Sequence, residues 1–180
     1  MVERLSLNSF NCRGLCNSMK RRAVFQWLKT YHQGITLLQE THSTESCENI
    51  WKKEWGGDII FSHGSSLARG VAILIPKGLD YTVNNSSKDK DGRFILMDIK
   101  TEDWELLLCN VYFPTKDKHK DQLDFINYII NQISDYSDHN LVIGGDFNIC
   151  IDSTLDKMGG EQIQNTNSQH LESLCDDFNL

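Results

Sequence analysis

Four short apolar runs follow one another between Asp58 and Tyr112, with no segment of helical periodicity among them. Runs of this length, separated by turn signals such as Asp91-Gly92, are typical of consecutive β-strands. Consecutive strands form antiparallel or mixed sheets, and each sheet must bury at least one of its faces. Two sheets packed face to face are therefore the natural arrangement. The predicted strands are 58–62, 71–75, 94–99 and 105–112.

Segments with helical periodicity lie on both sides of this series, accompanied by further short strands. We expect these helices to cover the outer faces of the sheets, which defines an α/β (α+β) fold. The predicted helices are 18–32, 44–55, 119–136 and 167–177, and the additional predicted strands are 5–10, 35–39 and 141–143.

Local patterns refine the predicted helices. Ser18 and Thr44 stand where helix-capping residues are favoured. Trp51 and Trp55 are one helical turn apart and are interpreted as core residues. The long helix after residue 118 carries an apolar stripe, which we expect to face the core because amphipathic helices bury their apolar side. The stripe is Leu123, Ile126, Ile130 and Ile133.

Length and composition indicate a single globular domain over residues 1–180. The formal net charge of −7 counts against a protein that holds nucleic acid by electrostatic attraction alone. It does not count against a metal-dependent enzyme, because a bound cation partly neutralises the carboxylates of its site.

The chain shows neither a signal-peptide pattern nor an apolar run of membrane-spanning length, so we expect an intracellular protein without a membrane partner. Its six cysteines are scattered and form no paired motif, which indicates a reducing compartment and no disulfide framework. Cys109 and Cys150 adjoin apolar strands and are predicted to act as small buried apolar residues.

Four predicted strands end in the same way, with apolar residues up to the carboxyl end and polar residues directly after it. The polar residues are Asn11, Glu40 and Tyr112, and then Asp146 and Asn148 in the sequence GGDFN, which follows an apolar run predicted to be a buried strand. Open α/β sheets usually bind ligands at the carboxyl ends of their strands. Each single strand end has an ordinary structural explanation, but four of them at one sheet edge predict a site.

The side chains in this set favour one kind of chemistry. A few hard oxygen ligands suit Mg²⁺, which keeps several waters and binds through one or two carboxylates together with substrate phosphates. Asp146 is placed to orient or deprotonate a water, Asn148 to hold that water, and Tyr112 to donate a hydrogen bond to a phosphate oxygen. The set therefore indicates hydrolysis of phosphodiesters or phosphomonoesters.

Five motifs occur in an order that resembles the endonuclease/exonuclease/phosphatase superfamily. Within it, the chain is similar to the apurinic-endonuclease-like domain at the front of LINE (non-LTR) retrotransposon polyproteins. The motif sequences QETH and GGDFN, and the residues after GGDFN, are closer to that branch than to the inositol phosphatases. The motifs are Phe10 to Gly14, Leu38 to His42, Arg69 to Ile75, Asn110 to Pro114 and Gly145 to Asn148.

The resemblance implies a four-layer α/β/β/α sandwich of two mixed sheets flanked by helices. It implies nicking of DNA with Mg²⁺ or Mn²⁺, leaving a 3′-hydroxyl that primes reverse transcription at the target. The implied partners are DNA and the reverse transcriptase domain of the parent polyprotein. We further expect a monomer, with the parent activity in the nucleus. Arg69 and His42 are weaker candidates for contact with DNA, and a solvated loop position is the preferred interpretation of His42.

The resemblance also implies a role for each residue of the set. Glu40 is the main metal ligand, with Asn11 beside it. Tyr112 supports the scissile phosphate. Asp146 activates or orients the attacking water, and Asn148 steadies that water.

The carboxyl-terminal part departs from the family pattern. The family continues with a segment that carries an Asp and then a closing Ser-Asp-His, whose His stabilises the pentacovalent phosphate, whereas this sequence stops at Leu180. The triplet Ser137-Asp138-His139 lies before GGDFN instead of after it, so we interpret it as the end of a helix. We therefore expect an incomplete copy that lacks the final strands of the fold and is inactive or nearly so.

Two alternatives remain open at this point. One is an inactive remnant, or a domesticated DNA-binding module, that keeps the fold and uses the old cleft for recognition. The other is a phosphatase of the same superfamily that acts on a small phosphorylated substrate.

Overall fold

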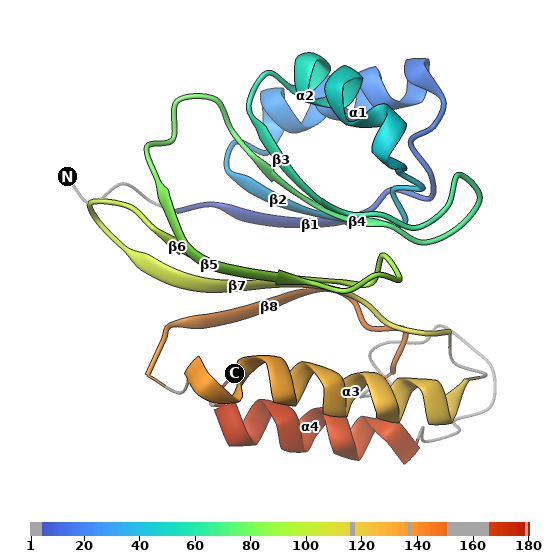
Figure 1. Ribbon diagram of the computed structural model, residues 1–180, viewed down its shortest axis with the longest axis vertical. Coiled ribbons are helices and arrows are strands. Elements are labelled where there is room, and N and C mark those ends of the chain that lie inside the picture. Colours follow the sequence, from blue (N-terminus) through green and yellow to red (C-terminus); the bar gives the residue numbers. More distant parts are fainter. Residues whose placement is uncertain (1–4, 116–117, 137, 151–165, 179) are drawn as a thin grey trace.

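The computed structural model describes residues 5–115, 118–136, 138–150, 166–178 and 180. Two four-stranded sheets lie face to face in the middle, α1 and α2 cover one of them, and α3 and α4 cover the other (Figure 1). The predicted four-layer α/β/β/α sandwich is thereby confirmed. The helices are α1 (Ser18–Tyr31), α2 (Glu48–Trp55), α3 (His119–Ile133) and α4 (Thr166–Phe178), with short 3₁₀ turns η1 (Glu45–Cys47) and η2 (Ser134–Tyr136).

Both sheets are mixed, and each contains one parallel pair. The first has the order β1-β2-β4-β3, in which only β1 and β2 are parallel. The second has the order β5-β6-β7-β8, in which only β7 and β8 are parallel. The strands are β1 (Leu7–Asn11), β2 (Ile35–Gln39), β3 (Asp58–Ser62), β4 (Val71–Ile75), β5 (Thr82–Lys88), β6 (Phe94–Lys100), β7 (Glu105–Tyr112) and β8 (Leu141–Asp146).

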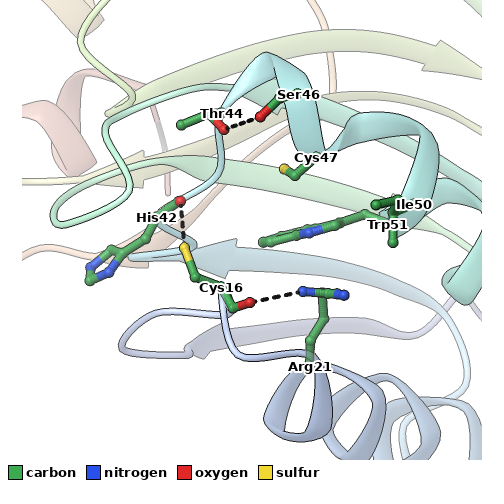
Figure 2. A pocket seen from close by; sticks show the side chains of 8 residues that line it. All are labelled: Cys16, Arg21, His42, Thr44, Ser46, Cys47, Ile50 and Trp51. Carbon is green, nitrogen blue, oxygen red and sulfur yellow. Dashed lines mark hydrogen bonds between the residues drawn. The ribbon is translucent and has the colours of Figure 1, made fainter.

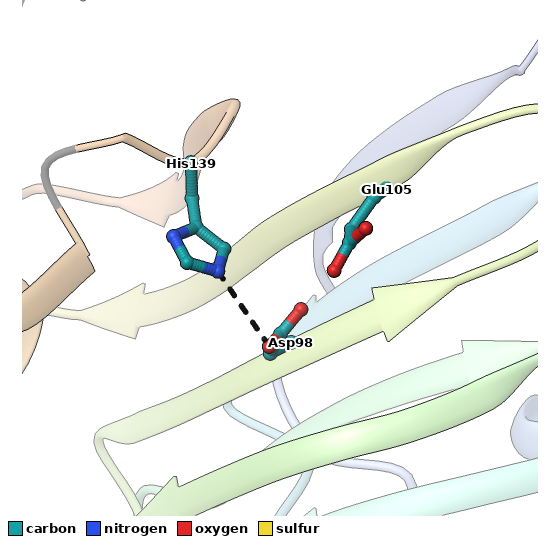
Figure 3. A group of neighbouring side chains, drawn as sticks. All are labelled: Asp98, Glu105 and His139. Carbon is teal, nitrogen blue, oxygen red and sulfur yellow. Dashed lines mark ion pairs between the residues drawn. The ribbon is translucent and has the colours of Figure 1, made fainter.

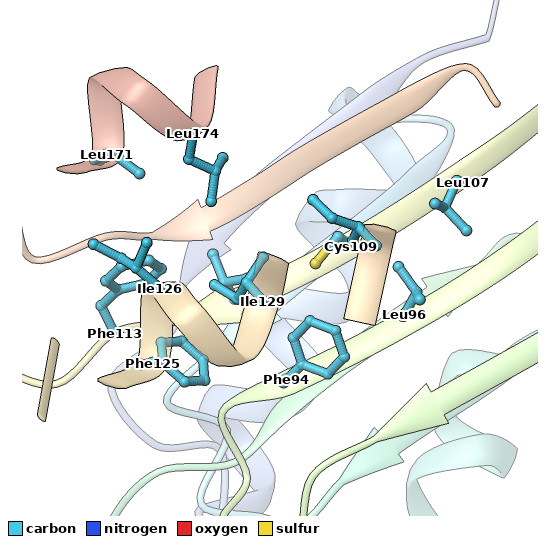
Figure 4. Close-up of a cluster of buried hydrophobic side chains, with 12 residues drawn as sticks. Phe94, Leu96, Leu107, Cys109, Phe113, Phe125, Ile126, Ile129, Leu171 and Leu174 are labelled. Atoms are coloured by element: carbon cyan, nitrogen blue, oxygen red, sulfur yellow. The ribbon is translucent and has the colours of Figure 1, made fainter. Parts of the chain in front are cut away.

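Apolar side chains fill all three spaces between the layers. Residues alternate along the central strands, so that Ile95 and Met97 of β6 face the other sheet while Phe94 and Leu96 face the helices. Figure 4 shows the second of these sets packed beneath α3 and α4. Trp51 and Trp55 of α2 are buried against the first sheet, as predicted. The cluster around them also contains Phe25, Leu28, Leu38, Phe61 and Leu74.

The structure corrects several predicted details of the strands. β5 is absent from the predicted strands, because all of its residues but Val83 are polar and almost all are exposed. β8 is half-buried along its length and not fully buried, since among the described residues it pairs on one side only, with β7. Cys109 is buried as predicted, whereas Cys150 is only partly buried.

The helices also differ from prediction in their ends and faces. Asn17, and not Ser18, caps α1, because its Oδ1 accepts hydrogen bonds from the N–H groups of Met19 and Lys20. Thr44 makes no capping hydrogen bond, and a 3₁₀ turn precedes α2. The buried face of α3 is rotated from the predicted stripe, since Leu123 and Ile130 are only partly buried; the buried residues are Gln122, Phe125, Ile126, Ile129 and Ile133.

A polar contact joins the two sheets in the middle of the apolar layer. Asn110 of β7 is fully buried and donates from Nδ2 to the carbonyl oxygens of Leu38 (3.1 Å) and Ala72 (2.9 Å) in the opposite sheet. Its Oδ1 accepts a hydrogen bond of 2.8 Å from Nε2 of Gln39. Because a buried polar group is tolerated only with partners, this contact fixes how β7 lies against β2 and β4.

We expect the substitution Asn110→Leu to lower the free energy of unfolding by about 3 kcal/mol, because it leaves buried carbonyl groups without donors. Urea denaturation measures the change. The control is Asn131→Leu at an exposed position of α3, which should alter stability by less than about 0.5 kcal/mol. Equal midpoints for the two variants would show that the contact between the sheets is dispensable.

Candidate functional site

Four of the five predicted catalytic side chains meet where β1, β2, β7 and β8 end. Asn11 Nδ2 donates to Glu40 Oε1 (2.9 Å) and to Asp146 Oδ2 (2.6 Å). The Tyr112 hydroxyl donates to the same Glu40 oxygen at 3.1 Å. The register explains the convergence, because Asn11 pairs with Gln39, the residue before Glu40, and Tyr112 pairs with Asp146. We call Asn11, Glu40, Tyr112 and Asp146 the carboxylate cluster.

Asn11 holds the two carboxylates of this cluster together through its nitrogen. Its oxygen faces elsewhere and accepts the N–H of Arg13 at 3.1 Å. A metal ligand would have to use that oxygen, since an amide nitrogen carries protons and no available lone pair. Ligation by Asn11 therefore requires the side-chain amide to turn over and give up the Arg13 contact.

The rim of the cluster is built from unusual backbone conformations. All five non-glycine residues with positive φ in the described chain lie on its loops. Such conformations are costly, and they cluster at functional sites because the surrounding structure must hold them in place. The residues and φ values are Arg13 (45°), Glu40 (51°), His42 (56°), Arg69 (64°) and Asn148 (49°).

Backbone hydrogen bonds hold the Glu40 loop in this conformation. The Glu40 carbonyl accepts the N–H of Gly14 at 2.6 Å, and the N–H of Thr41 donates to the Gly70 carbonyl at 2.9 Å. At Gly70 a β-carbon would lie 2.4 Å from the Thr41 hydroxyl, so only glycine allows this close approach. Two neighbouring loops thereby fix the position of Glu40.

Asn148 occupies a different position from the rest of the predicted set. Its N–H donates to Asp146 Oδ1 at 3.1 Å, which fixes the carboxylate. Its side-chain Nδ2 donates to the Phe113 carbonyl at 3.0 Å, so the amide nitrogen is used within the loop. The buried Gln122 of α3 donates to the Asn148 carbonyl at 3.3 Å and ties this loop to the helix layer.

Tyr112 is the most enclosed member of the carboxylate cluster. Burial raises the pKa of its phenol to about 12, and the neighbouring Glu40 carboxylate acts in the same direction. The hydroxyl therefore keeps its proton at neutral pH and remains a hydrogen-bond donor.

Sequence reasoning missed Arg93, which lies against Tyr112. Its guanidinium is 5.2 Å from the centroid of the Tyr112 ring, and Nη1 donates to the Tyr112 carbonyl at 3.0 Å. Burial lowers the pKa of Arg93, and the positive charge of Arg69 adds to this effect. The position of Arg93 after a turn gave no signal, because a charged residue there is ordinary. Its guanidinium brings positive charge to the side of the cluster that Tyr112 forms.

Arg69 and His42, the weaker candidates, lie together on the same rim. The N–H of His42 donates to the Arg69 carbonyl at 2.8 Å. The Arg69 side chain forms an exposed ion pair with Asp91, with Nη1 and Oδ1 3.0 Å apart. A ligand phosphate would have to compete with Asp91 for this guanidinium.

A separate pocket of about 300 Å³ lies behind the His42 loop. In Figure 2 its wall is formed by Trp51 and Arg21, whereas the His42 ring points away from it. Arg21 is ion-paired with Glu54 at 2.6 Å, so its charge is already balanced. This pocket contains no member of the carboxylate cluster. Its other lining residues are Cys16, Thr44, Ser46, Cys47 and Ile50.

His139 of the Ser-Asp-His triplet lies far from the carboxylate cluster. It precedes β8, whose first residue pairs with Leu107, whereas Tyr112 pairs with Asp146 at the other end. The two ends of β8 are five residue steps apart, which corresponds to roughly 17 Å along the strand. Ser137 of the triplet lies outside the described residues.

The carboxylate cluster has a donor set that fits a hard divalent cation. It offers two carboxylates, and among the described residues none donates a hydrogen bond to the second oxygen, Oε2, of Glu40. Carboxylate oxygens with room for water are what Mg²⁺ and Mn²⁺ prefer. The Asp98, Glu105 and His139 group at the opposite end of β7 is a second acidic cluster.

Comparison with known proteins identifies the family and the fold. The profile of the Endonuclease/Exonuclease/phosphatase family matches residues 8–159. A Xenopus laevis protein named Transposon TX1 uncharacterized 149 kDa protein is 29% identical over 150 residues, which is 83% of this chain and 11% of that protein. This chain thus spans about a tenth of the length of that relative.

Solved structures share the fold at low sequence identity. Humanized D. rerio TDP2 has a TM-score of 0.64 and 18% identity, covering 87% of this chain and 71% of that one. An AP endonuclease from Archaeoglobus fulgidus has a TM-score of 0.63 and 22% identity, covering 83% of this chain and 59% of that one.

No helix within the described ranges is long and apolar enough to cross a membrane. The family profile spans most of the chain, a transposon protein matches 83% of it, and the two-sheet sandwich is that of the solved structures. The chain therefore belongs to the endonuclease/exonuclease/phosphatase family as a nuclease-like domain related to a transposon protein.

Proposed function

We propose that this chain is a divalent-metal-dependent endonuclease domain that nicks DNA phosphodiester bonds for target-primed reverse transcription. The supporting observation is the carboxylate cluster, in which Glu40 and Asp146 lie within hydrogen-bond distance of the same Asn11 nitrogen. Two carboxylates brought so close repel each other unless a cation or a donor stands between them. The neutral Asn11 amide already donates to both carboxylates, and a cation would offset their repulsion more strongly, which supports a cation site here.

Glu40, with Asn11 turned over to present its oxygen, would hold Mg²⁺ or Mn²⁺. When bound, the cation neutralises charge on the phosphate and so supports attack on phosphorus. Asp146 accepts a hydrogen bond from the attacking water and takes its proton. The water oxygen bonds to phosphorus and the bond from phosphorus to the 3′ oxygen breaks, which leaves a 5′-phosphate on one side of the nick. The 3′ oxygen takes up a proton from solvent water and leaves as a 3′-hydroxyl.

Tyr112 and the two arginines complete this proposal on the phosphate side. The Tyr112 phenol retains its proton, since its pKa is raised to about 12, and donates to a non-bridging oxygen. Arg93 is held beside it and supplies positive charge, while Arg69 and His42 contact the backbone of the DNA at the rim. Asn148 positions Asp146 through its backbone N–H.

The wider role rests on similarity to the transposon protein. This chain matches only 11% of that relative, which leaves ample length there for other domains. We propose that the chain acts as a monomer, in the nucleus, joined to a reverse transcriptase that extends the 3′-hydroxyl. Local positive charge from arginines at the rim offsets the overall charge of −7 when DNA approaches.

We expect Glu40→Gln to abolish Mg²⁺-dependent nicking of supercoiled plasmid, because the amide removes the charge that holds the cation. Nicking is measured with excess enzyme over many hours, so that slow turnover is also detected. Any longer product of the same reading frame is assayed alongside. Glu45→Gln is the matched control, since Glu45 is exposed on η1.

Metal binding provides a second readout that does not depend on nicking. Mg²⁺ or Mn²⁺ should raise the melting temperature of the wild-type chain and of Glu45→Gln but not of Glu40→Gln. If no form of the protein nicks DNA while the melting shift persists, the endonuclease proposal fails and metal binding stands. Hydrolysis of a soluble phosphomonoester without any nicking would instead identify a phosphatase.

We expect Tyr112→Phe to slow nicking by roughly tenfold to a hundredfold, because one donor to the phosphate is lost. The sign of the pH effect follows from the raised pKa of this acid. Because the pKa of Tyr112 is raised to about 12, its phenol stays neutral above the usual phenol pKa. Ionisation of Tyr112 should therefore cause no fall in nicking between pH 9 and pH 11. The control is Tyr31→Phe, since Tyr31 is 73% exposed.

A further inference from the structure

We propose that Asp98, Glu105 and His139 form a second cation site, which takes a divalent transition metal and Zn²⁺ in particular. One ligand atom from each residue lies within 4.8 Å of the other two. The three side chains come from β6, from the first residue of β7 and from the turn before β8. This site is separate from the carboxylate cluster and does not rest on the proposed nuclease function.

Asp98 carries the first observation. It is 5% exposed, yet its Oδ1 has no hydrogen-bond partner, and its Oδ2 has His139 Nε2 only at 3.8 Å. A distance of 3.8 Å is too long for a hydrogen bond. In Figure 3 the unpartnered oxygen points into the space between Glu105 and His139. A buried carboxylate without partners is costly unless it is paired or coordinates a metal.

Unsatisfied polar atoms are concentrated at this place. Within the described ranges, only three buried side-chain polar atoms lack a hydrogen-bond partner, and two of them are Asp98 Oδ1 and His139 Nδ1. The third is Thr36 Oγ1 in β2. His139 Nδ1 points away from Asp98, whereas Nε2 faces it, so Asp98 Oδ1 is the unsatisfied atom that a ligand at this place would satisfy (Figure 3). Unsatisfied buried groups are rare in native proteins, and this one calls for a partner.

The strand register places the two acids on the same face of the sheet. Asp98 pairs with Leu107, so Glu105, two residues earlier on β7, is its diagonal neighbour. His139 approaches from the turn above that face, where its ring packs edge-on against Tyr136 with centroids 5.1 Å apart. Its backbone N–H donates to the Tyr136 carbonyl at 3.0 Å, which anchors the turn.

The spacing suits a small cation with short bonds. Zinc binds imidazole nitrogen and carboxylate oxygen at about 2.0–2.2 Å, which puts neighbouring tetrahedral ligands roughly 3.4 Å apart. His139 and Asp98 are already 3.8 Å apart, so a shift of a few tenths of an ångström closes that edge. Imidazole with two carboxylates favours Zn²⁺ over Mg²⁺ or Ca²⁺, which prefer oxygen alone.

Glu105 is available to complete the site. It hydrogen-bonds Lys100 (2.8 Å) and Asn84 (3.1 Å), and the bond from Lys100 keeps the pKa of its carboxyl below the usual range. The carboxyl is therefore ionised at neutral pH, as a ligand must be. Replacing the exposed Lys100 with a metal ion costs little free energy, because surface ion pairs of this kind contribute little to stability.

The test is a titration of the purified chain with Co²⁺, a spectroscopic substitute for Zn²⁺, in excess Mg²⁺ that fills hard oxygen sites. We expect visible d–d bands that Zn²⁺ removes by competition, without the near-ultraviolet band of a metal–thiolate bond. Asp98→Asn and His139→Gln should each weaken binding by roughly tenfold or more. Glu105→Gln should also weaken it.

Matched controls locate the effect. Asp103→Asn and His170→Gln change exposed residues of the same types and should leave the Co²⁺ affinity unchanged. Glu40→Gln should leave it unchanged as well, whatever its effect on nicking. In the same samples, Zn²⁺ should raise the melting temperature of the wild-type chain and of the controls more than that of the three ligand variants.

Three results would overturn the proposal. They are equal affinity in wild type and in the ligand variants, a thiolate charge-transfer band, and loss of binding in Glu40→Gln alone. If Asp98→Asn does not fold, His139→Gln and Glu105→Gln decide the question, because both residues are nearer the surface and replaceable without opening the core.

Discussion

The contact between the faces of the two sheets governs the rest of this molecule. Neither parallel pair makes a site by itself, because β1 and β2 carry Asn11 and Glu40 while β7 and β8 carry Tyr112 and Asp146. The sheets must meet in one orientation for these residues to share hydrogen bonds. Apolar packing between them is non-directional and does not select that orientation closely. Asn110 does, since its hydrogen bonds to Leu38 and Ala72 form only in one alignment.

The alignment of the sheets also explains why the costly backbone conformations are tolerated. Glu40 follows directly after β2, so any shift between sheets would pull its left-handed loop away from Tyr112. The loop is held by Gly14 on one side and Gly70 on the other. The strands and the hydrogen-bonded loops thus hold the carboxylates of Glu40 and Asp146 together before any cation binds. Such preorganisation is what electrostatic catalysis requires.

Much of this fold could be predicted because its central strands are apolar runs of strand length. The carboxyl-end argument anticipated which side chains follow the strands, and the geometry brings Asn11, Glu40, Tyr112 and Asp146 together. β5 was not predicted, because an exposed edge strand does not need apolar residues. The face of α3 was misjudged because a pattern of apolar residues counts Gln122 as polar. Gln122 is buried, and its Nε2 donates to the Pro114 and Asn148 carbonyls.

Other features depend on tertiary contacts that no local pattern records. Arg93 lies beside the carboxylate cluster only because its guanidinium lies over the Tyr112 ring. The orientation of Asn148 follows from a positive φ that permits its side chain to reach the Phe113 carbonyl. Asp98 stands in the middle of an apolar strand, and its partner His139 is 41 residues away in sequence. Proximity of that kind appears only once the register of β6 and β7 is known.

The two ends of β8 connect the proposed cation sites through one strand. Asp146 ends β8 beside Asn11, and His139 precedes its first residue beside Asp98. Among the described residues β8 pairs only with β7, so its hydrogen bonds alone hold it less firmly than a central strand is held. A cation bound to Asp98 and His139 would fasten the start of β8 to β6.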